Sequence, residues 1–229
     1  MSVIPTSEPK AFAWSYSQLT GFETCGLRYY HYNVAKDVTE PDDSGLREGN
    51  RLHKAFENRI LHAEPLPFGM GMYENMLAKI VAAPGATLGE QKLAITSSFT
   101  PVTFFHKDVW FRTVIDAAKI DATTARIFDW KTGKVKKDTT QLQLMSAAVF
   151  HHDKRIERVK AALVFVAHGQ LEREEFVRGD VTEIWSEILP RVKALEHARV
   201  TNTFLPKPSG LCKRYCAVRT CAYHGRGTS

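Results

Sequence analysis

The stretch from Phe111 to Lys134, FRTVIDAAKIDATTARIFDWKTGK, predicts two neighbouring strands that carry acidic side chains among apolar ones. Asp116 interrupts the first apolar run, and Asp129 comes at the end of the second. Lys131 follows Asp129 by two residues and therefore shares its strand face. Two carboxylates on adjacent strands can hold Mg²⁺ or Mn²⁺, and a nearby ammonium can stabilise charge on a phosphate. The pattern fits metal-assisted phosphodiester hydrolysis. The alternative is that Asp129 and Lys131 are only a solvated ion pair at a strand end, which the same tripeptide would also give.

Hydrophobic spacing along the rest of the chain predicts an α/β fold with a central mixed sheet flanked by helices. We expect strands over residues 88–99, 102–120, 125–130, 159–167 and 171–178. We expect helices over residues 16–32, 45–62, 72–82, 139–152 and 180–200. The strand over 171–178 is the more polar one and belongs at a sheet edge, and Asp180 is the expected cap of the last helix.

These elements predict a single domain over residues 1–229. Residues 1–13 form a loose leader, and residues 14–204 form the core. Residues 205–229 form a cysteine-rich metal-binding tail, which we expect to dock on the N-terminal helix.

The composition excludes several classes of protein. Hydrophobic residues make up 44% and charged residues 24% of the 229, which rules out a disordered or collagen-like chain. No stretch approaches the roughly 20 apolar residues of a membrane span, and the N-terminus lacks the apolar run of a signal peptide, so we expect a cytoplasmic protein. Lys and Arg number 31 against 25 Asp and Glu, and the resulting charge of +6 suits a polyanionic partner.

Four motifs, in order along the chain, resemble the RecB-like exonuclease branch of the PD-(D/E)XK nuclease superfamily. They are Gly49 with His53, then Asp116, then Asp129-Trp130-Lys131-Thr132-Gly133, and finally Gln141. The opening segments Ser15–Leu19 and Arg28–Tyr30 resemble the first helix of the same branch. One departure is Met145, which stands where the branch carries a tyrosine four residues after the glutamine; Gln143 is an alternative register for that glutamine.

The resemblance implies a restriction-endonuclease-like core and a divalent ion, Mg²⁺ or Mn²⁺. The implied ligands are His53, Asp116, Asp129 and the main-chain carbonyl of Trp130. Lys131 would be the catalytic lysine, and Gln141 would support the site or contact DNA. Glu90 falls where such nucleases often carry a further acidic strand residue. A helical histidine such as His53 can also serve as a core residue without binding metal. Glu57 lies one turn beyond it and could either orient the imidazole or lie in solvent.

The cysteines divide into one early and three late residues: Cys25, Cys212, Cys216 and Cys221. In an intracellular protein such a set more often holds metal than forms disulfides. The resemblance implies a 4Fe–4S cluster, because AddB and CRISPR-associated RecB-like nuclease domains carry the same layout. A structural Zn²⁺ bound by the three late cysteines and His224, or four reduced thiols without metal, remain alternatives.

Basic and aromatic residues predict sequence-nonspecific contact with DNA, single-stranded or at duplex ends. The basic residues are Lys134, Lys136 and Lys137 after the second strand, and Lys207, Lys213, Arg214, Arg219 and Arg226 in the tail. The tyrosines suited to stacking on bases are Tyr29, Tyr30, Tyr32, Tyr215 and Tyr223.

The function that the resemblance implies is metal-dependent DNA exonucleolysis in recombination, repair or DNA processing, in a cell or a virus. The alternatives are a non-cleaving nucleic-acid-binding module on the same fold and a structure-specific endonuclease. The sequence identifies no protein partner.

Overall fold

The computed structural model describes residues 12–39, 44–135 and 137–226. Contacts divide the chain into two compact units, one of residues 43–185 and one of residues 1–42 together with 186–229. Most of the expected leader, and Lys136 among the expected basic residues, lie outside the described residues. The expectation of one domain over the whole chain stays a prediction.

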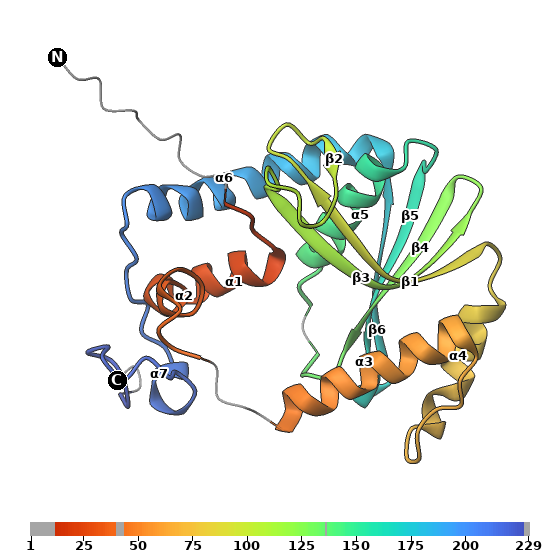
Figure 1. The fold of residues 1–229 in the computed structure, drawn as a ribbon, viewed down its shortest axis with the longest axis horizontal. Helices are drawn as coiled ribbons and strands as arrows, with labels where there is room; N and C mark the ends of the chain where they lie inside the picture. Colours follow the sequence, from red (N-terminus) through yellow and green to blue (C-terminus); the bar gives the residue numbers. More distant parts are fainter. Residues whose placement is uncertain (1–11, 40–43, 136, 227–229) are drawn as a thin grey trace. The chain divides into compact units, whose positions relative to one another are not determined.

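The unit of residues 43–185 contains a mixed sheet with the strand order β2-β1-β3-β4-β5-β6 (Figure 1). Its strands are β1 (Ala86–Ile95), β2 (Pro101–Val102), β3 (Phe111–Asp121), β4 (Thr124–Lys131), β5 (Arg158–Phe165) and β6 (Gln170–Val177). β4 and β5 are parallel and are connected through α5 (Thr140–His152), whereas all other neighbouring pairs are antiparallel. The predicted α/β architecture is confirmed, and β6 lies at the edge as expected.

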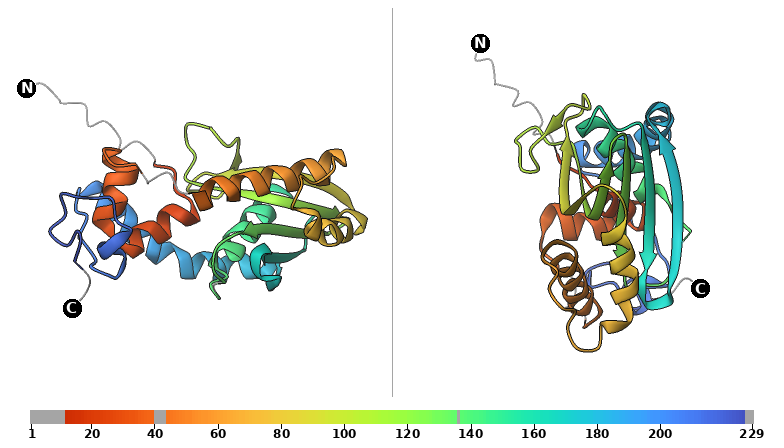
Figure 2. Two further views of the ribbon diagram at one scale, coloured as in Figure 1. Left: turned by 90° about the horizontal axis from the view of Figure 1, so that it is seen from below. Right: turned by 90° about the vertical axis from the view of Figure 1, so that its right-hand side faces the viewer.

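Helices cover both faces of this sheet (Figure 2). α3 (Ser44–His62) lies on one face with the 3₁₀ turn η2 (Gly71–Tyr73) and α4 (Glu74–Ala82), and α5 lies on the other. Leu52, Phe56 and Ile60 recur every four residues on α3, so they form one apolar stripe, and all three are buried. The Phe56 ring meets the Trp130 ring of β4 edge to face at 5.4 Å, which fixes α3 against the end of that strand.

The expected strand over residues 102–120 is wrong in its first half. β2 ends at Val102, and the chain then makes two turns, in which His106 N–H donates to Thr103 O and Val109 N–H donates to His106 O. Phe105, in these turns, is 83% exposed, so its aromatic character marks no buried strand. A smaller correction applies to β5, which ends at Phe165 because the chain enters the 3₁₀ turn η3 (Val166–His168).

Asp180 does not cap the last helix in the expected way. Its Oδ2 accepts a hydrogen bond of 2.7 Å from Val177 N–H, across the 3₁₀ turn η4 (Arg178–Asp180) that precedes α6 (Val181–Val200). The carboxylate therefore stabilises the turn that leads into the helix, and Pro190 lies inside a helix that the structure leaves continuous.

The second unit begins with three short helical segments instead of the helix expected over residues 16–32. They are α1 (Tyr16–Thr24), α2 (Gly26–Tyr29) and the π-helical segment η1 (Tyr30–Ala35). The break is at Cys25, whose backbone is extended. Gly26 makes the break possible, because a Cβ there would lie 3.0 Å from the carbonyl oxygen of Leu205, to which Leu27 N–H donates. The tail backbone thus replaces helical hydrogen bonds that the break removes.

The tail docks on these N-terminal helices, as predicted. Immediately before the tail, Phe204 packs on the rings of Tyr29 and Tyr30, with centroid distances of 6.1 and 5.1 Å. Lys207 Nζ donates to the main-chain oxygen of Glu23 at 2.9 Å. Only one short helix, α7 (Leu211–Arg214), interrupts the described tail, so these side-chain contacts do much of the anchoring.

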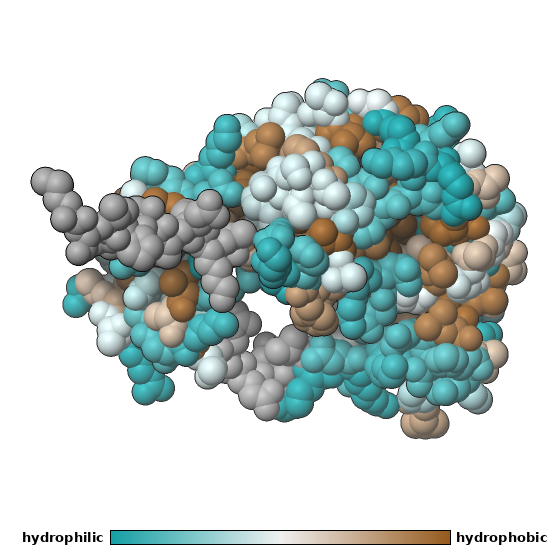
Figure 3. Space-filling model, turned by 45° about the horizontal axis from the view of Figure 1, so that its top comes forward, coloured by the Kyte–Doolittle hydropathy of each residue, from teal (hydrophilic) through white to brown (hydrophobic). Residues whose placement is uncertain are grey.

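No helix within the described residues has the length and apolar character needed to cross a membrane. Figure 3 shows one face of the molecule, on which hydrophilic residues predominate and hydrophobic ones form small separate patches. Phe68, Met72 and Phe105 are among the exposed large apolar side chains.

His151 predicts a pH-dependent part of the stability. Its Nε2 lies 3.1 Å from Trp185 Nε1–H and its ring stacks on Phe99, so the folded state favours the neutral imidazole. Burial, helped by the charges of Lys154 and neighbouring groups, lowers the pKa of His151 from 6.5 to about 4. The unfolded chain therefore binds more protons between these pH values, and the free energy of unfolding falls as the pH drops from 6.5 toward 4.

We expect the His151→Gln variant to lose less stability than the wild type when the pH is lowered from 7 to 4.5. The ring is partly exposed, so we expect a difference of about 1 kcal/mol, measured by urea unfolding at pH 7 and pH 4.5. His62→Gln, at the exposed end of α3, is the control and should behave like the wild type. Equal losses in the His151 variant and the wild type would assign the pH dependence to other groups.

Candidate active site

The two predicted carboxylates lie where the pairing of β3 and β4 ends. The ladder runs from Asp121 opposite Thr124 to Ala117 opposite Phe128, and Asp116 and Asp129 are the next residues along the two strands. Beyond that point, Asp116 Oδ2 accepts a hydrogen bond of 2.8 Å from Trp130 N–H. A side-chain oxygen therefore takes over a main-chain donor at the end of the ladder, which fixes the Asp116 carboxylate beside β4.

Asp129, Lys131 and Gln141 form a closed set of polar contacts. Lys131 Nζ lies 2.6 Å from Asp129 Oδ2 and donates to Gln141 Oε1 at 2.7 Å. Gln141 Nε2 in turn donates to Asp129 Oδ1 at 2.8 Å. The amide of Gln141, in the first turn of α5, can satisfy both partners because it carries a donor and an acceptor. The three side chains that the sequence places in two separate motifs thus meet at one point.

The Asp129 carboxylate is held in an unfavourable environment for a charge. Its side chain is 8% exposed, and its Oδ2 accepts no well-oriented hydrogen bond from the described residues, even though Lys131 Nζ is close. Burial raises the pKa of Asp129; the charge of Lys131 opposes this rise, and the charge of Asp116 adds to it. Lys131 offsets this cost only in part, and a divalent ion near Oδ2 would offset more of the burial and of the repulsion.

His53 joins the set through Asp116. Its Nδ1 lies 3.1 Å from Asp116 Oδ1, and this hydrogen bond is the main cause that raises the pKa of His53, against an opposing effect of burial. Gly49, one turn earlier on α3, lets the helix approach β4, because a Cβ there would lie 3.3 Å from Thr132 Oγ1. The contact between Gly49 and Thr132 could not be predicted, because nothing in the sequence identifies the atom that Gly49 faces.

Two other acidic residues considered for the site make different contacts. Glu57 pairs with the exposed Lys54 at 2.7 Å, and its own side chain is 20% exposed. Glu90 pairs with Lys92 at 3.0 Å and its side chain is 46% exposed. The register of β1 and β3 nevertheless places Glu90 opposite Asp116, between the pairs Gly89–Ala117 and Gln91–Ile115. Met145, which stands where the branch carries a tyrosine, is fully buried in α5.

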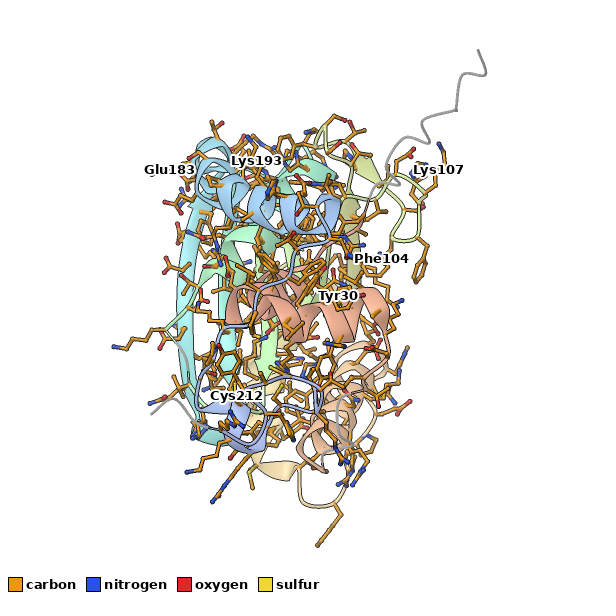
Figure 4. All side chains as sticks on the ribbon, turned by 90° about the vertical axis from the view of Figure 1, so that its left-hand side faces the viewer. Tyr30, Phe104, Lys107, Glu183, Lys193 and Cys212 are labelled. Carbon is orange, nitrogen blue, oxygen red and sulfur yellow. The ribbon has the colours of Figure 1, made fainter. Side chains whose placement is uncertain are left out.

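The four cysteines all line one small cavity in the second unit. Cys25 Sγ accepts from Lys207 N–H and Cys212 Sγ accepts from Ser209 N–H, each at 3.4 Å. Cys212 lies in the tail as Figure 4 shows. His224, the expected alternative ligand, is exposed and does not line the cavity.

No three His, Cys, Asp or Glu side chains among residues 12–39, 44–135 and 137–226 are grouped so that they could hold a metal ion in this structure. The His53, Asp116 and Asp129 set has the chemistry of a divalent-ion site, with two carboxylates, an imidazole and a buried carboxylate oxygen that lacks a hydrogen bond. The ligand sets inferred from the sequence therefore stay predictions.

Comparison with known proteins identifies the family. The profile described as the PD-(D/E)XK nuclease superfamily matches residues 13–221, which include every residue of the site and all four cysteines. The chain belongs to the PD-(D/E)XK nuclease superfamily. Membership implies nuclease activity, a nucleic-acid substrate and the use of divalent metal ions, which are general properties of these nucleases.

Other comparisons add little to this assignment of a PD-(D/E)XK nuclease. A search of curated proteins found no match. One solved structure, described as "Crystal structure of SSO0001", is similar over 95% of this chain and 89% of its own, at 11% identity and a TM-score of 0.41. A similarity at that level carries no conclusion about this nuclease.

In the absence of divalent ions, the contributions of Lys131 and Asp129 to the free energy of unfolding should be strongly coupled. Lys131→Met leaves the buried carboxylate without its cation, so we expect a loss of about 1–3 kcal/mol in the free energy of unfolding measured in EDTA. The double variant Lys131→Met, Asp129→Asn should lose less stability than the sum of the two single variants, by about 1 kcal/mol or more. The exposed pair Glu90–Lys92 is the control cycle, and its coupling should stay below about 1 kcal/mol. Equal coupling in the two cycles would show that burial of Asp129 has no energetic effect.

Proposed function

We propose that this PD-(D/E)XK nuclease is a metal-dependent DNA exonuclease of the RecB-like branch, acting in DNA recombination, repair or processing. The observation that carries the proposal is the convergence of Asp116, Asp129, Lys131 and Gln141 at the end of the β3–β4 ladder. The order of these residues along the chain, together with Gly49 and His53 on α3, supports the RecB-like branch over a general nuclease assignment.

The residues that would hold Mg²⁺ or Mn²⁺ are Asp116, Asp129 and His53, with the main-chain carbonyl of Trp130. The Asp129 oxygen without a hydrogen bond is the donor that gains most from an ion, because its charge is buried and only partly compensated. A divalent ion bound there would supply positive charge to the scissile phosphate and to the attacking water.

Lys131 would act on the water and the phosphate. Its ammonium is held by Gln141 Oε1, so its position is fixed before substrate binds. From there Nζ can donate a hydrogen bond to the attacking water or to a non-bridging phosphate oxygen, where negative charge grows in the transition state. The water oxygen forms a bond to phosphorus and loses a proton to solvent, while the bond to the leaving sugar oxygen breaks and that oxygen takes up a proton. Gln141 is a positioning residue in this scheme, because it acts through Lys131 and Asp129.

Basic side chains support binding of a polyanion without base readout. Lys134 and Lys137, which follow β4, are exposed. Five basic residues of the tail are exposed as well: Lys207, Lys213, Arg214, Arg219 and Arg226. Exposed Lys and Arg contact phosphates whatever the sequence, which suits an exonuclease that must act on every nucleotide in turn.

Lys131→Ala should lower cleavage of linear DNA by at least about 100-fold, because it removes the cation that stabilises the transition state. The measurement uses single-stranded and duplex DNA labelled at either end, with Mg²⁺, Mn²⁺ or EDTA. Lys154→Ala, an exposed lysine in the turn after α5, is the matched control and should cleave like the wild type. Digestion that starts from the ends and spares circular DNA is the expected result. Cleavage of circles would replace the proposal with an endonuclease, and binding without metal-dependent cleavage would replace it with a non-cleaving module.

We also propose that Cys25, Cys212, Cys216 and Cys221 bind a structural 4Fe–4S cluster, for which four cysteines are the usual ligand set. Their common cavity supports this, as do the main-chain N–H groups that donate to Cys25 Sγ and Cys212 Sγ, since such bonds stabilise thiolates. A single Zn²⁺ needs its donors grouped around one point, whereas a cluster holds its four thiolates further apart. The position of His224 outside the cavity also favours four cysteine ligands.

Protein purified without oxygen should be brown, with about four iron and four sulfide per chain. Cys25→Ala should lose most of the iron and the broad visible absorption. His224→Ala is the control and should keep both. Zinc without iron, lost in His224→Ala and kept in Cys25→Ala, would establish the Cys₃His site in place of the cluster.

A further inference from the structure

The loop between β2 and β3, residues 103–110, presents two adjacent aromatic rings at the edge of the sheet that carries the candidate active site. Phe104 and Phe105 meet edge to face, with their ring centroids 5.2 Å apart. Phe104 is half-buried, whereas Phe105 is exposed. Figure 4 marks Phe104 and, three residues later in the same loop, Lys107. The loop and the candidate site belong to the same unit, residues 43–185.

The loop is ordered by its own hydrogen bonds, although the Phe105 ring is exposed. Besides the two main-chain bonds that form its turns, Asp108 N–H donates to His106 Nδ1 at 3.2 Å. Its far end is anchored by the buried Trp110, whose N–H donates to Ile95 O at 2.9 Å. A ring that is already held in place loses little conformational entropy when a ligand covers it. The loop therefore presents Phe105 ready for contact with a partner.

Arg112, the second residue of β3, extends this aromatic surface along the sheet. Its guanidinium lies over the Phe104 ring, with Cζ 5.4 Å from the ring centroid. A guanidinium beside an aromatic ring can contact a phosphate while the ring stacks on a base. The loop and the start of β3 thus combine the two side-chain types that bind single strands of nucleic acid.

A strip of partly exposed side chains leads from Arg112 to the candidate site. Burial alternates along the first seven residues of β3, so Arg112, Val114 and Asp116 share the more exposed face. On β1, the exposed Lys92 lies opposite Val114. Four residues at the rise of a strand separate Arg112 from Asp116 by about 13 Å. A stacked DNA strand rises about 3.4 Å per nucleotide, so this distance corresponds to about four nucleotides.

The surface around Phe105 is too small and too polar for a stable protein interface. Three exposed polar residues follow the ring, and two of them, Lys107 and Asp108, pair at 3.3 Å. A stable interface buries about 800 Å² on each partner and keeps charged residues out of its centre. A nucleobase, in contrast, needs only one ring to stack on.

We propose that Phe105 stacks on an unpaired base of the DNA strand whose scissile phosphate lies at Asp116 and Asp129, and that Arg112 contacts the backbone of that strand. Stacking of this kind does not read sequence, which suits an exonuclease. In a duplex the faces of inner bases are hidden in the stack, so the substrate class is single-stranded DNA long enough to span about four nucleotides. The inference deepens the proposed exonuclease and rests on it for the identity of the strand.

The test is equilibrium binding of fluorescein-labelled (dT)₁₂ in EDTA, by anisotropy, so that cleavage plays no part. Phe105→Ala should weaken binding at least about five-fold, because it removes one base–aromatic stack. Its Tm should not fall, since the ring is exposed. Phe105→Trp keeps a stacking ring and should bind at least as tightly as the wild type. Phe68→Ala removes another fully exposed phenylalanine, from the loop between α3 and α4, and is the matched control with normal binding.

Oligomer length tests the distance between the loop and the site. With Mg²⁺, Phe105→Ala should raise KM for (dT)₁₂ about five-fold and leave kcat unchanged, because it removes binding that substrate and transition state share. Both constants for (dT)₃ should stay at wild-type values, because three nucleotides do not span about 13 Å. An equal rise in KM for (dT)₃ would overturn the proposal.

Unchanged (dT)₁₂ affinity in Phe105→Ala, with a native circular dichroism spectrum, would also overturn it, as would an equal loss in Phe68→Ala or no binding by the wild type. A dimer that depends on Phe105, seen by size-exclusion chromatography beside unchanged DNA affinity, would assign the loop to a second copy of the chain instead. The same data separate the two proposals. Wild-type cleavage with normal binding by Phe105→Ala keeps the nuclease and removes the stacking site, whereas binding that depends on Phe105 without wild-type cleavage does the reverse.

Discussion

The structure around the site depends on one constraint, which is that β3 and β4 stop pairing at Ala117 and Phe128. If the ladder continued, Asp116 and Asp129 would face each other with their charges uncompensated. Because it ends there, the Asp116 carboxylate can take the Trp130 N–H, and Asp129 can be enclosed by Lys131 and Gln141. The lost main-chain hydrogen bonds are replaced by stronger, charge-assisted ones, so the strand ends stay ordered while two acidic groups remain side by side.

The parts of the site that could be predicted from the sequence are those fixed by short spacing. Asp129 and Lys131 share a face because strands have a period of two, and Leu52 and Phe56 on α3 turn toward the sheet because helices have a period near four. The break at Cys25 could not be predicted, because its cause is the backbone of Leu205, far along the chain. The strand expected after Val102 was wrong because aromatic residues such as Phe104 and Phe105 favour strands, whereas burial depends on the rest of the fold. In the structure Phe105 is exposed.

Two glycines are required because another part of the chain approaches them closely. Gly49 brings α3 against Thr132, and Gly26 brings the break after α1 against Leu205. In both places a methyl group would press on an atom at 3.0–3.3 Å, so the approach itself selects glycine. Gly21 differs, since a Cβ there would meet nothing within 4 Å, so close packing does not explain this glycine.

The second unit poses a problem of chain entropy that the first does not. Its two segments, residues 1–42 and 186–229, are joined through the whole of the other unit, and its helices in the first segment have four to nine residues. Contacts such as Phe204 on Tyr30 must therefore close a very long loop with a small core. A link between Cys25 and the tail cysteines would remove much of that freedom from the unfolded chain, by the same effect that makes a disulfide across a long loop stabilising. On this physical ground a metal centre held by the four cysteines would stabilise the folded second unit, and it would need no redox role to account for its position.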